Sequence, residues 1–394
     1  MSDQNQSGRG PIWIWAILPI VLLIGLVWAV AALDPTQALR GNAPPIETLV
    51  FQRVVLDDYG ITATVLNDGP DAVTIAQVQV DEAYWQFSQE PAGALGHLAQ
   101  ARISIPYPWV EGEVHELRLI SATGVTFDHE IAVATRTPTP DRQFLKIFTL
   151  IGLYVGVIPV CLGLLWFPMV GRLGRSGLDF VLALTVGLLV FLLIDTVDDG
   201  LEIAGEIAAS YQGTVLFLGT AALAYLTIEM LGSTLRRRRK GAPDGWVTAL
   251  TVAFGIGLHN LGEGLAIGAA FALGEASLGT LLIVGFMLHN TTEGLAIVAP
   301  LTGSSTPIRD LVALGLLAGV PTILGTWIGG FTYSPMWALV FLAVGAGAIA
   351  QVSVQILKGT AAGRALPELL TTMPVISGLV VGLGVMYATG MLIG

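Results

Sequence analysis

The sequence predicts an all-α polytopic membrane protein, an eight-helix bundle, preceded by an N-terminal transmembrane anchor and a small extracytoplasmic β-sandwich. Three observations support this fold class. The 394-residue chain is 54% hydrophobic and only 12% charged, about half the charged fraction of a typical soluble protein. Apolar stretches of about 20 residues, long enough to cross about 30 Å of hydrocarbon, recur along the chain. One region near the N-terminus instead alternates short β-branched runs with turn residues.

The first apolar segment, residues 11–33, follows Arg9 and contains three Trp residues. Its length and its Trp content favour a retained membrane anchor, and we therefore assign residues 1–33 to an anchor domain. The tripeptide Ala29-Val30-Ala31 keeps the alternative open, a secretory signal that is cleaved after export. Either outcome exports the residues that follow.

Residues 34–143 are predicted to form the extracytoplasmic domain. Within residues 46–134, short apolar runs recur at roughly 8–12-residue spacing and are separated by turn signals such as Asn-Asp-Gly-Pro-Asp at 67–71, a pattern typical of a small β-sandwich. The expected strands lie at 61–66, 73–80, 101–105, 114–120 and 125–133.

Three histidines of this domain, His97, His115 and His129, show no pair at a recognisable metal-ligand spacing. We expect them to be ordinary surface or strand residues. The alternative is weak metal capture at Asp128-His129-Glu130.

The remaining residues, 144–394, contain eight apolar segments that are predicted to be membrane-spanning helices. These segments cover approximately residues 145–168, 177–200, 212–234, 246–271, 277–301, 309–330, 334–357 and 372–393. If the sandwich is outside, every Lys and Arg in the loops between these segments falls on the inside, and the outside loops contain none. By the positive-inside rule, the basic loop 236–240 and the N-terminus are cytoplasmic, whereas residues 34–143 and the C-terminus are extracytoplasmic. The expected location is the cell membrane.

The net charge of −11 is concentrated in two regions. Residues 34–142 hold 15 Asp and Glu against 6 Lys and Arg, and residues 195–206 add five acids without a base. Neither region offers the basic patch of a nucleic-acid-binding protein, so no nucleic acid partner is expected. The single cysteine, Cys161, excludes a disulfide within the chain and any thiolate metal cluster.

The most specific signal is a repeated motif. Residues 259–267 read His-Asn-Leu-Gly-Glu-Gly-Leu-Ala-Ile and residues 289–297 read His-Asn-Thr-Thr-Glu-Gly-Leu-Ala-Ile, so seven of nine positions are identical. In each copy the His and Glu are four residues apart and therefore share one helix face. The turn between the two helices is centred near Gly274, 15 residues from each histidine. An antiparallel helix pair would therefore bring both copies to one depth in the bilayer.

A charged side chain at the bilayer centre costs about 2.5–3.5 kcal/mol, so such residues are paired, hydrated or functional. Two imidazoles and two carboxylates at one depth form a ligand set for a divalent cation, and Zn²⁺ accepts such N and O donors readily. The predicted metal site consists of His259, Glu263, His289 and Glu293. The alternative is a set of interhelical His–Glu hydrogen bonds that only join the helices.

A third acidic group lies at the outer end of the second segment. Asp195, Asp199, Glu202 and Glu206 follow one helical stripe, and Asp198 lies beside it. Asp195, Asp198, Asp199 and Glu202 are predicted to form a cation-attracting entry path, because a negative field raises the local concentration of cations. A solvated extension of the helix is the alternative. On the inner side, an exit route is one interpretation of Glu229, Gln351 and Gln355. Simple interhelical hydrogen bonding is an equally good interpretation of the three residues.

With these residues identified, the chain resembles the ZIP family of divalent metal transporters over residues 145–394. The resemblance rests on His259-Asn260-x-x-Glu263-Gly264 and on its second copy at 289–294, located on the fourth and fifth of the eight helices. It implies a fold in which the first and last three helices form an inverted repeat around those two. It also implies that Asn260 and Asn290 lie beside the four metal ligands.

Several positions depart from the family pattern. Gly262 and Thr292 stand where the family usually has a proline before the glutamate, and Val320 stands where many members have a glutamate that completes a second metal site. A histidine common in the second helix is also absent, and Asp195 or Asp198 is its expected substitute. We therefore expect one strong metal site rather than a binuclear centre.

The sequence thus predicts import of a divalent transition metal into the cytoplasm, with Zn²⁺ first and Fe²⁺ or Mn²⁺ as alternatives. The chain is expected not to be an enzyme and to use no cofactor other than the transported ion. An intramembrane metal-dependent hydrolase and a metal sensor are the competing functions, although no His-Glu-x-x-His motif is present. The expected partners are the metal ion and the lipid bilayer. A homodimer and a protein partner for the sandwich are left open.

Overall fold

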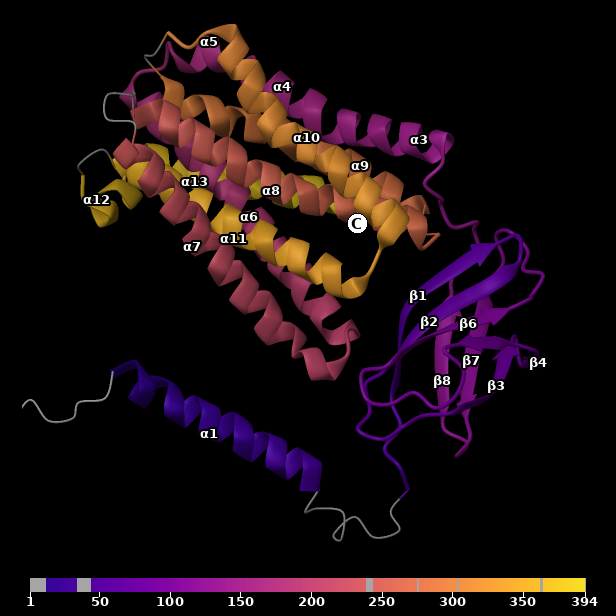
Figure 1. Ribbon diagram of the computed structural model, residues 1–394. Coiled ribbons are helices and arrows are strands. Elements are labelled where there is room, and N and C mark those ends of the chain that lie inside the picture. The colour runs from indigo at the N-terminus through magenta and orange to yellow at the C-terminus, as the bar shows by residue number, and fades with distance from the viewer. Residues whose placement is uncertain are drawn as a thin grey trace, which may run out of the picture. The chain divides into compact units, whose positions relative to one another are not determined.

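The computed structural model describes residues 12–33, 44–238, 244–274, 276–302, 305–361 and 364–393. The chain divides into two compact units, Met1–Ile46 and Glu47–Gly394. In the first unit, helix α1 (Ile12–Leu33) forms over the predicted anchor segment (Figure 1). Arg9, residues 34–43 and the basic-loop residues 239–240 lie outside the described residues.

The predicted β-domain consists of two four-stranded antiparallel sheets. The first sheet has the spatial order β1 (Leu49–Asp57), β2 (Gly60–Asn67), β6 (Gln100–Ile105) and β5 (Ser88–Glu90). The second has the order β4 (Ala83–Trp85), β3 (Ile75–Val80), β7 (His115–Ser121) and β8 (Thr126–Ile131).

One apolar core joins the two sheets. Ile61 and Val65 of the first sheet belong to the same fully buried cluster as Val78 and Leu119 of the second. The alternation of buried and more exposed residues along β6 and β7 reflects the period of two that the sequence displays. The predicted turn at 67–71 is confirmed, because the Asn67 side chain donates to a main-chain carbonyl at the far end of the turn over 2.7 Å.

The sequence analysis did not single out three of the strands. Strand β1 has no strict apolar alternation and contains a register shift between Phe51 and Arg53. Strands β4 and β5 have three residues each, too few for a periodic signal. These two strands form because they pair with longer neighbouring strands.

The rest of the second unit is helical. Its elements are α3 (Arg142–Gly152), the π-helical segment η1 (Leu153–Val157), α4 (Ile158–Leu164), α5 (Phe167–Val170), α6 (Arg175–Glu206), η2 (Ala209–Tyr211), α7 (Gly213–Arg238), α8 (Asp244–Ala272), α9 (Ala276–Val298), η3 (Ala299–Leu301), α10 (Ile308–Thr332), α11 (Pro335–Ala361), α12 (Leu366–Leu370) and α13 (Met373–Ile393). Among the described residues, seven helical segments are long and apolar enough to cross a bilayer, and α13 contributes a shorter apolar stretch, Met373–Ala388.

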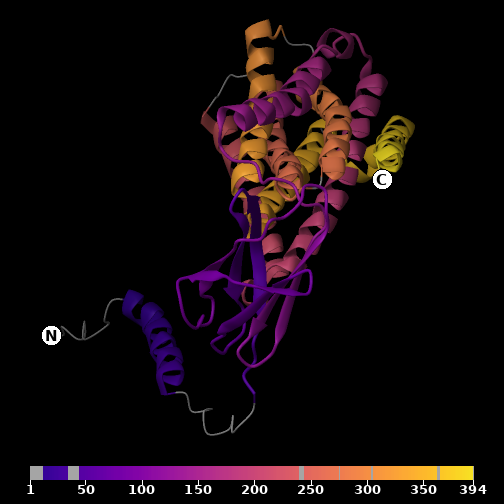
Figure 2. The same ribbon diagram turned by 90° about the vertical axis from the view of Figure 1, so that its right-hand side faces the viewer.

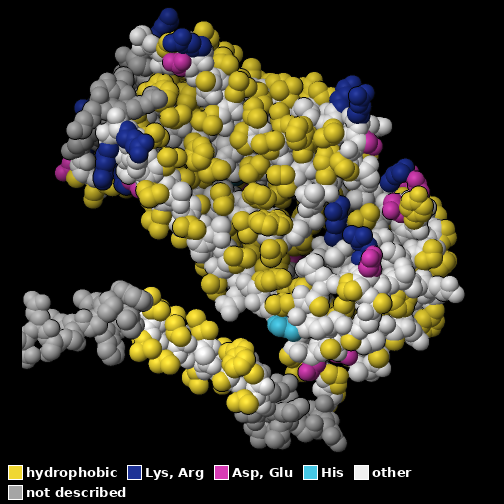
Figure 3. Space-filling model, in the orientation of Figure 1, with side chains coloured by type: hydrophobic (Ala, Val, Ile, Leu, Met, Phe, Trp, Pro, Cys, Tyr) yellow, Lys and Arg dark blue, Asp and Glu magenta, His cyan; other side chains and the backbone are white. Residues whose placement is uncertain are grey.

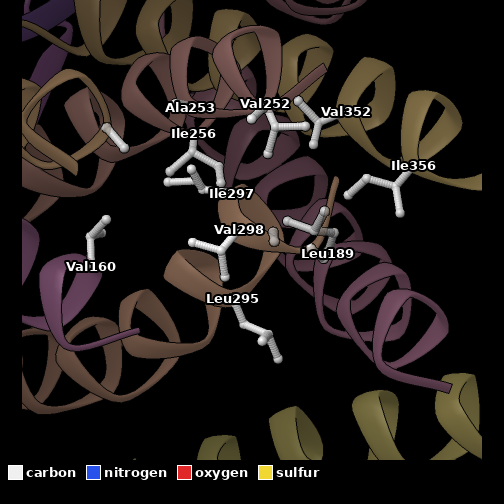
Figure 4. Packing of buried hydrophobic residues seen from close by; sticks show 14 of the residues in the cluster. Val160, Leu189, Val252, Ala253, Ile256, Leu295, Ile297, Val298, Val352 and Ile356 are labelled. Atoms are coloured by element: carbon white, nitrogen blue, oxygen red, sulfur yellow. The ribbon is translucent and has the colours of Figure 1, made fainter. Parts of the chain in front are cut away.

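These eight segments coincide with the eight predicted spans to within a few residues. Hydrophobic side chains cover the visible surface of the helices, and charged side chains gather toward their ends (Figure 3). The chain is therefore a multi-pass helical membrane protein. Val160, Leu189, Val252, Ile256 and Val298 are among the buried residues that pack α4, α6, α8 and α9 together (Figure 4).

Glycines allow the helices next to the motif copies to approach closely. A Cβ added to Gly264 of α8 would lie 2.1 Å from the carbonyl oxygen of Thr322 in α10, and one on Gly325 of α10 would lie 2.2 Å from that of Leu261. Small residues of this kind are how membrane helices gain van der Waals contact. They fix the position of α8 against α10.

The β-sandwich lies at one end of the helices (Figures 1 and 2) and contacts three of the connections there. The Asp68 carboxylate accepts hydrogen bonds from the main-chain N–H groups of Ala209 (2.6 Å) and Ser210 (3.1 Å) in η2, between α6 and α7. These bonds satisfy donors at the start of a helical turn that would otherwise need water.

The second and third contacts involve α10 and the α8–α9 turn. The Arg53 guanidinium donates to the Phe331 carbonyl at the end of α10 over 3.0 Å. Gly274 has a φ of +84°, and a Cβ there would lie 2.5 Å from the Val133 carbonyl oxygen of the sandwich. A glycine is therefore required at this turn for both its backbone conformation and its close approach.

The first testable prediction concerns Asp68. Burial opposes its ionisation, but the hydrogen bonds from Ser210 and Ala209 outweigh that effect and hold the pKa of Asp68 below the ordinary value of 3.8. The contact therefore stabilises the folded state fully at neutral pH and weakens only as the pH falls below about 3.8 through the lowered pKa. Asp68→Ala is expected to speed amide exchange at Ala209 and Ser210 about tenfold at pH 7, measured by hydrogen–deuterium exchange.

The matched control is Asp58→Ala. Asp58 is an exposed carboxylate that accepts a hydrogen bond from Arg136 rather than from a helix connection. Exchange in η2 should not change in this variant. Equal exchange in η2 for Asp68→Ala and the unaltered protein would show that the Asp68 contact does not hold the sandwich to the helices.

Candidate metal centre

Two imidazoles and one carboxylate meet between α8 and α9. His259 Nε2 lies 2.9 Å from Glu263 Oε1, and His289 Nε2 contacts the same oxygen. All three side chains are buried, and their three ligand atoms lie within 4.8 Å of one another. Ligand atoms around a tetrahedral zinc ion lie about 3.4 Å apart, given Zn–N distances of about 2.0–2.1 Å. Small shifts would therefore allow one ion to bind all three atoms.

The α8–α9 hairpin creates this meeting. His259 lies 13 residues before the end of α8 at Ala272, and His289 lies 13 residues after the start of α9 at Ala276. At 1.5 Å per residue, both histidines are about 20 Å from the turn. The equal depth expected for the two motif copies is confirmed.

The two asparagines tie the site to neighbouring helices. Asn290 Nδ2 donates to Glu263 Oε2 (2.9 Å) and to the Val155 carbonyl in η1 (3.0 Å). Asn260 Nδ2 donates to the Ala318 carbonyl in α10 (3.1 Å). Both side chains are fully buried. They hold α8 and α9 in register with α10 and with the π-helical segment η1. Short π-helical segments are frequent at functional sites.

Glu293 occupies a different position from the other three predicted ligands. It is 4% exposed and interacts electrostatically with His259, His289 and Glu263, but it lies outside the group whose ligand atoms are within 4.8 Å. The sequence places His289 and Glu293 on one helix face, yet the His289 imidazole bonds to Glu263 of the adjacent helix. A single carboxylate therefore serves both imidazoles.

Four buried oxygen atoms around this cluster have no hydrogen-bond donor within the described part of the chain. They are both carboxylate oxygens of Glu293 and the Oδ1 atoms of Asn260 and Asn290. Asn260 lies close to Glu293 without a hydrogen bond of normal geometry. Burying acceptor atoms without partners is costly. A cation is the partner that suits a cluster in which oxygen acceptors outnumber donors.

The predicted entry residues divide into two groups. Asp195 interacts electrostatically with His289, His259 and Glu263. It lies 11 residues before the end of α6 at Glu206, and therefore at a depth comparable to that of the cluster. Asp198 is exposed on the same helix. Both face the surface of the folded chain rather than the core.

Asp199 and Glu202 line a cavity of about 250 Å³ between α6, α8, α9 and α11. The cavity reaches Gly262, next to Glu263, and Phe286, whose ring is 5.4 Å from that of His289. It therefore extends from the acidic end of α6 to the vicinity of the cluster. The sequence analysis did not identify Phe286, because an aromatic residue in an apolar helix carries no signal of its own.

The residues considered for an exit route bond to one another. Gln351 Nε2 of α11 donates to Glu229 Oε2 of α7 (3.0 Å) and to Gln355 Oε1 (2.9 Å). The bond between Gln351 and Glu229 joins α11 to α7. This is the interhelical hydrogen bonding that was the alternative to an exit route.

The histidines of the sandwich have separate neighbours. His115 Nδ1 lies 2.8 Å from Asp81 Oδ2, and the His129 ring stacks on Phe51 at 4.9 Å. His97 Nδ1 contacts a main-chain carbonyl. Throughout the described ranges, the cluster between α8 and α9 is the one group of three His, Cys, Asp or Glu residues with suitably spaced ligand atoms.

No protein-family model matches the sequence, and no curated protein sequence matches it significantly. The function must therefore be argued from the site itself. Imidazole nitrogens bind transition metals in the neutral form, so an ion entering this site would take the place of the protons shared with Glu263. Two glutamates would cancel the charge of a divalent ion.

A second prediction tests the buried acceptors. Glu293→Gln is expected to raise the melting temperature of the metal-free protein by about 2–5 °C, because a neutral amide is less costly to bury than a carboxylate without donors. The same variant should lose most of the thermal stabilisation that Zn²⁺ gives the unaltered protein, because binding to the folded state raises its stability. Thermal denaturation in detergent, with and without ZnCl₂, measures both effects.

Glu368→Gln provides the control for this experiment, since Glu368 is exposed on α12. Neither melting temperature should change in that variant. A Glu293→Gln protein that keeps the full Zn²⁺-induced shift would exclude Glu293 from the metal site.

Proposed function

We propose that this chain transports divalent transition metal ions across a cell membrane into the cytoplasm, with Zn²⁺ as the first candidate and Fe²⁺ or Mn²⁺ as alternatives. One observation carries the proposal: two imidazoles and a carboxylate converge in apolar helices, next to buried oxygen acceptors that have no hydrogen-bond donor among the described residues. Such groups are energetically costly within a bilayer. They are therefore rare there and usually mark a pathway for ions or substrates.

Each residue has a role in this proposal. His259, His289 and Glu263 bind the ion, and Glu293 moves toward it as the fourth ligand and completes the charge balance. Asn260 and Asn290 orient the helices that carry these ligands. Coordination by only three or four protein groups, without a closed thiolate shell, favours an ion that can be both bound and released.

The acidic end of α6 supports entry from the side of the sandwich. Asp195 and Asp198 create a negative field there, and Asp199 and Glu202 line the cavity that leads toward the cluster. A negative field raises the local concentration of a divalent cation and speeds its capture.

The basic residues support the orientation of the chain in this proposal. Arg172, Arg175, Arg309 and Arg364 lie in or next to connections at the helix ends opposite the sandwich. By the positive-inside rule, that end faces the cytoplasm and the sandwich faces outside. Arg364 also donates two hydrogen bonds of 2.9 Å to Asp179, which fixes the connection after α11 against α6.

The resemblance to the ZIP family agrees with this proposal. The eight helical segments and the repeated His-Asn-x-x-Glu-Gly motif on α8 and α9 are the features that the chain shares with that family. Val320 provides no carboxylate beside the cluster, and the described residues hold a single group of suitably spaced ligands. We therefore propose one transported ion per site.

The third prediction tests transport directly. In proteoliposomes loaded with a zinc-sensitive dye, Glu263→Gln is expected to reduce the initial Zn²⁺ uptake at least about 100-fold, because the single carboxylate shared by both imidazoles is lost. Glu293→Gln should reduce it by about tenfold or more. Competition with Fe²⁺, Mn²⁺ and Co²⁺ in the same assay measures selectivity.

Glu368→Gln serves again as the matched charge control and should transport at the unaltered rate. Equal insertion of all variants is checked by their size-exclusion profiles. Undiminished uptake by a Glu263→Gln, Glu293→Gln double variant would refute the transport proposal, and turnover of a lipid or peptide without ion flux would favour a hydrolase.

A further inference from the structure

A groove in the described part of the β-domain lies far from the proposed metal centre. It has a volume of about 770 Å³ and runs over the outer face of the sheet β1-β2-β6-β5. Side chains on this face alternate with those that enter the sandwich core. Nothing in the proposed transport function uses this surface.

The floor of the groove carries two arginines and a threonine in one cross-strand row. Arg53 on β1 is paired with Thr64 on β2, and Thr64 is paired with Arg102 on β6. Adjacent strands are about 4.7–4.9 Å apart, so the two arginine Cα atoms are roughly 10 Å apart with the threonine between them. Two guanidinium groups at this spacing can converge on one anion.

Most donors of the groove have no partner in the described part of the protein. The side chains of Arg102, Thr62, Thr64 and Ser104 make no hydrogen bond or ion pair there. Arg102 on β6 is paired with Thr64 on β2, and Ser104 on β6 is paired with Thr62 on β2. Guanidinium forks and hydroxyl groups together form the donor set that recognises a phosphate group.

One edge of the groove lies at the end of a helix that is long and apolar enough to cross a membrane. Arg53, at one edge of the groove, donates to the Phe331 carbonyl, which lies in the last turn of the membrane-spanning helix α10. Basic side chains are visible where β1 approaches this end of the helices (Figure 3). Lipid phosphates lie at the depth where a spanning helix leaves the hydrocarbon.

Two carboxylates select among phosphate compounds. Asp57 lines the groove, and Glu90 is paired with Arg102 on the neighbouring strand β5. They would repel free phosphate, which carries more than one negative charge on average near neutral pH. A phosphodiester carries one negative charge, and a cationic amine attached to it would be attracted by the carboxylates.

We propose that this groove binds the headgroup of a zwitterionic phospholipid from the leaflet on the sandwich side. The phosphodiester lies between Arg53, Thr64 and Arg102, and the ammonium group lies toward Asp57 or Glu90. This inference is independent of metal transport, because it rests only on the sandwich and on its contact with the end of α10.

Native mass spectrometry of the full chain, purified in detergent and mixed with phosphatidylethanolamine, tests the proposal. Arg102→Gln is expected to reduce retained phosphatidylethanolamine about tenfold, because it removes a charge-assisted contact to the phosphate. Thr64→Val, which keeps the shape of a strand residue, should reduce it as well. Arg118→Gln is the control, since Arg118 lies on β7 of the other sheet and pairs with Asp128.

Three outcomes would overturn the proposal. One is equal lipid retention by the unaltered protein and both groove variants. Another is equal retention of a phosphate-free glycolipid. The third is a combined result: the unaltered protein binds inorganic phosphate, Arg102→Gln loses this binding, and the unaltered protein retains no more phosphatidylethanolamine than Arg102→Gln does. The circular dichroism of the variants, compared with that of Arg118→Gln, shows whether the sandwich remains folded.

Discussion

A carboxylate buried among apolar helices requires hydrogen-bonding partners, and Glu263 has three of them. Its Oε1 atom contacts the imidazoles of His259 and His289, and its Oε2 atom accepts from Asn290. These partners come from two helices, so the site exists only when α8 and α9 are antiparallel and in register. The Gly274 turn, the glycine contacts with α10 and the asparagine bonds to neighbouring carbonyls all serve this register.

The second carboxylate, Glu293, differs from Glu263 in its hydrogen-bond partners. Two carboxylates that share a small apolar space repel each other, and only one can take the available N–H donors. Glu263 accepts hydrogen bonds from them, whereas the two carboxylate oxygens of buried Glu293 have no hydrogen-bond donor of normal geometry among the described residues. A divalent ion would resolve this imbalance by attracting both groups. Glu293 accordingly lies outside the three-residue cluster.

The two ends of the helices differ in charge and in cover. One end carries the acids of α6 and contacts the β-sandwich through Asp68 and Arg53. The other carries Arg172, Arg175, Arg309 and Arg364. The sandwich therefore lies at the acidic end of the helices, and its core is complete without the helices. Both proposals for this protein depend on that placement.

The amino-acid pattern alone determined the spans, the strands of the alternating runs and the equal depth of the two motif copies, because hydrophobic periodicity and chain length act locally. It also selected His259, Glu263 and His289, which the structure brings together, and Glu293, which lies outside that group. Tertiary packing decided the rest. A spacing of four allows His289 to pair with Glu293, and only the rotation of α9 against α8 directs His289 to Glu263. Likewise, the α6 cavity and the Arg53 contact join residues far apart in sequence, whose proximity depends on how whole elements pack.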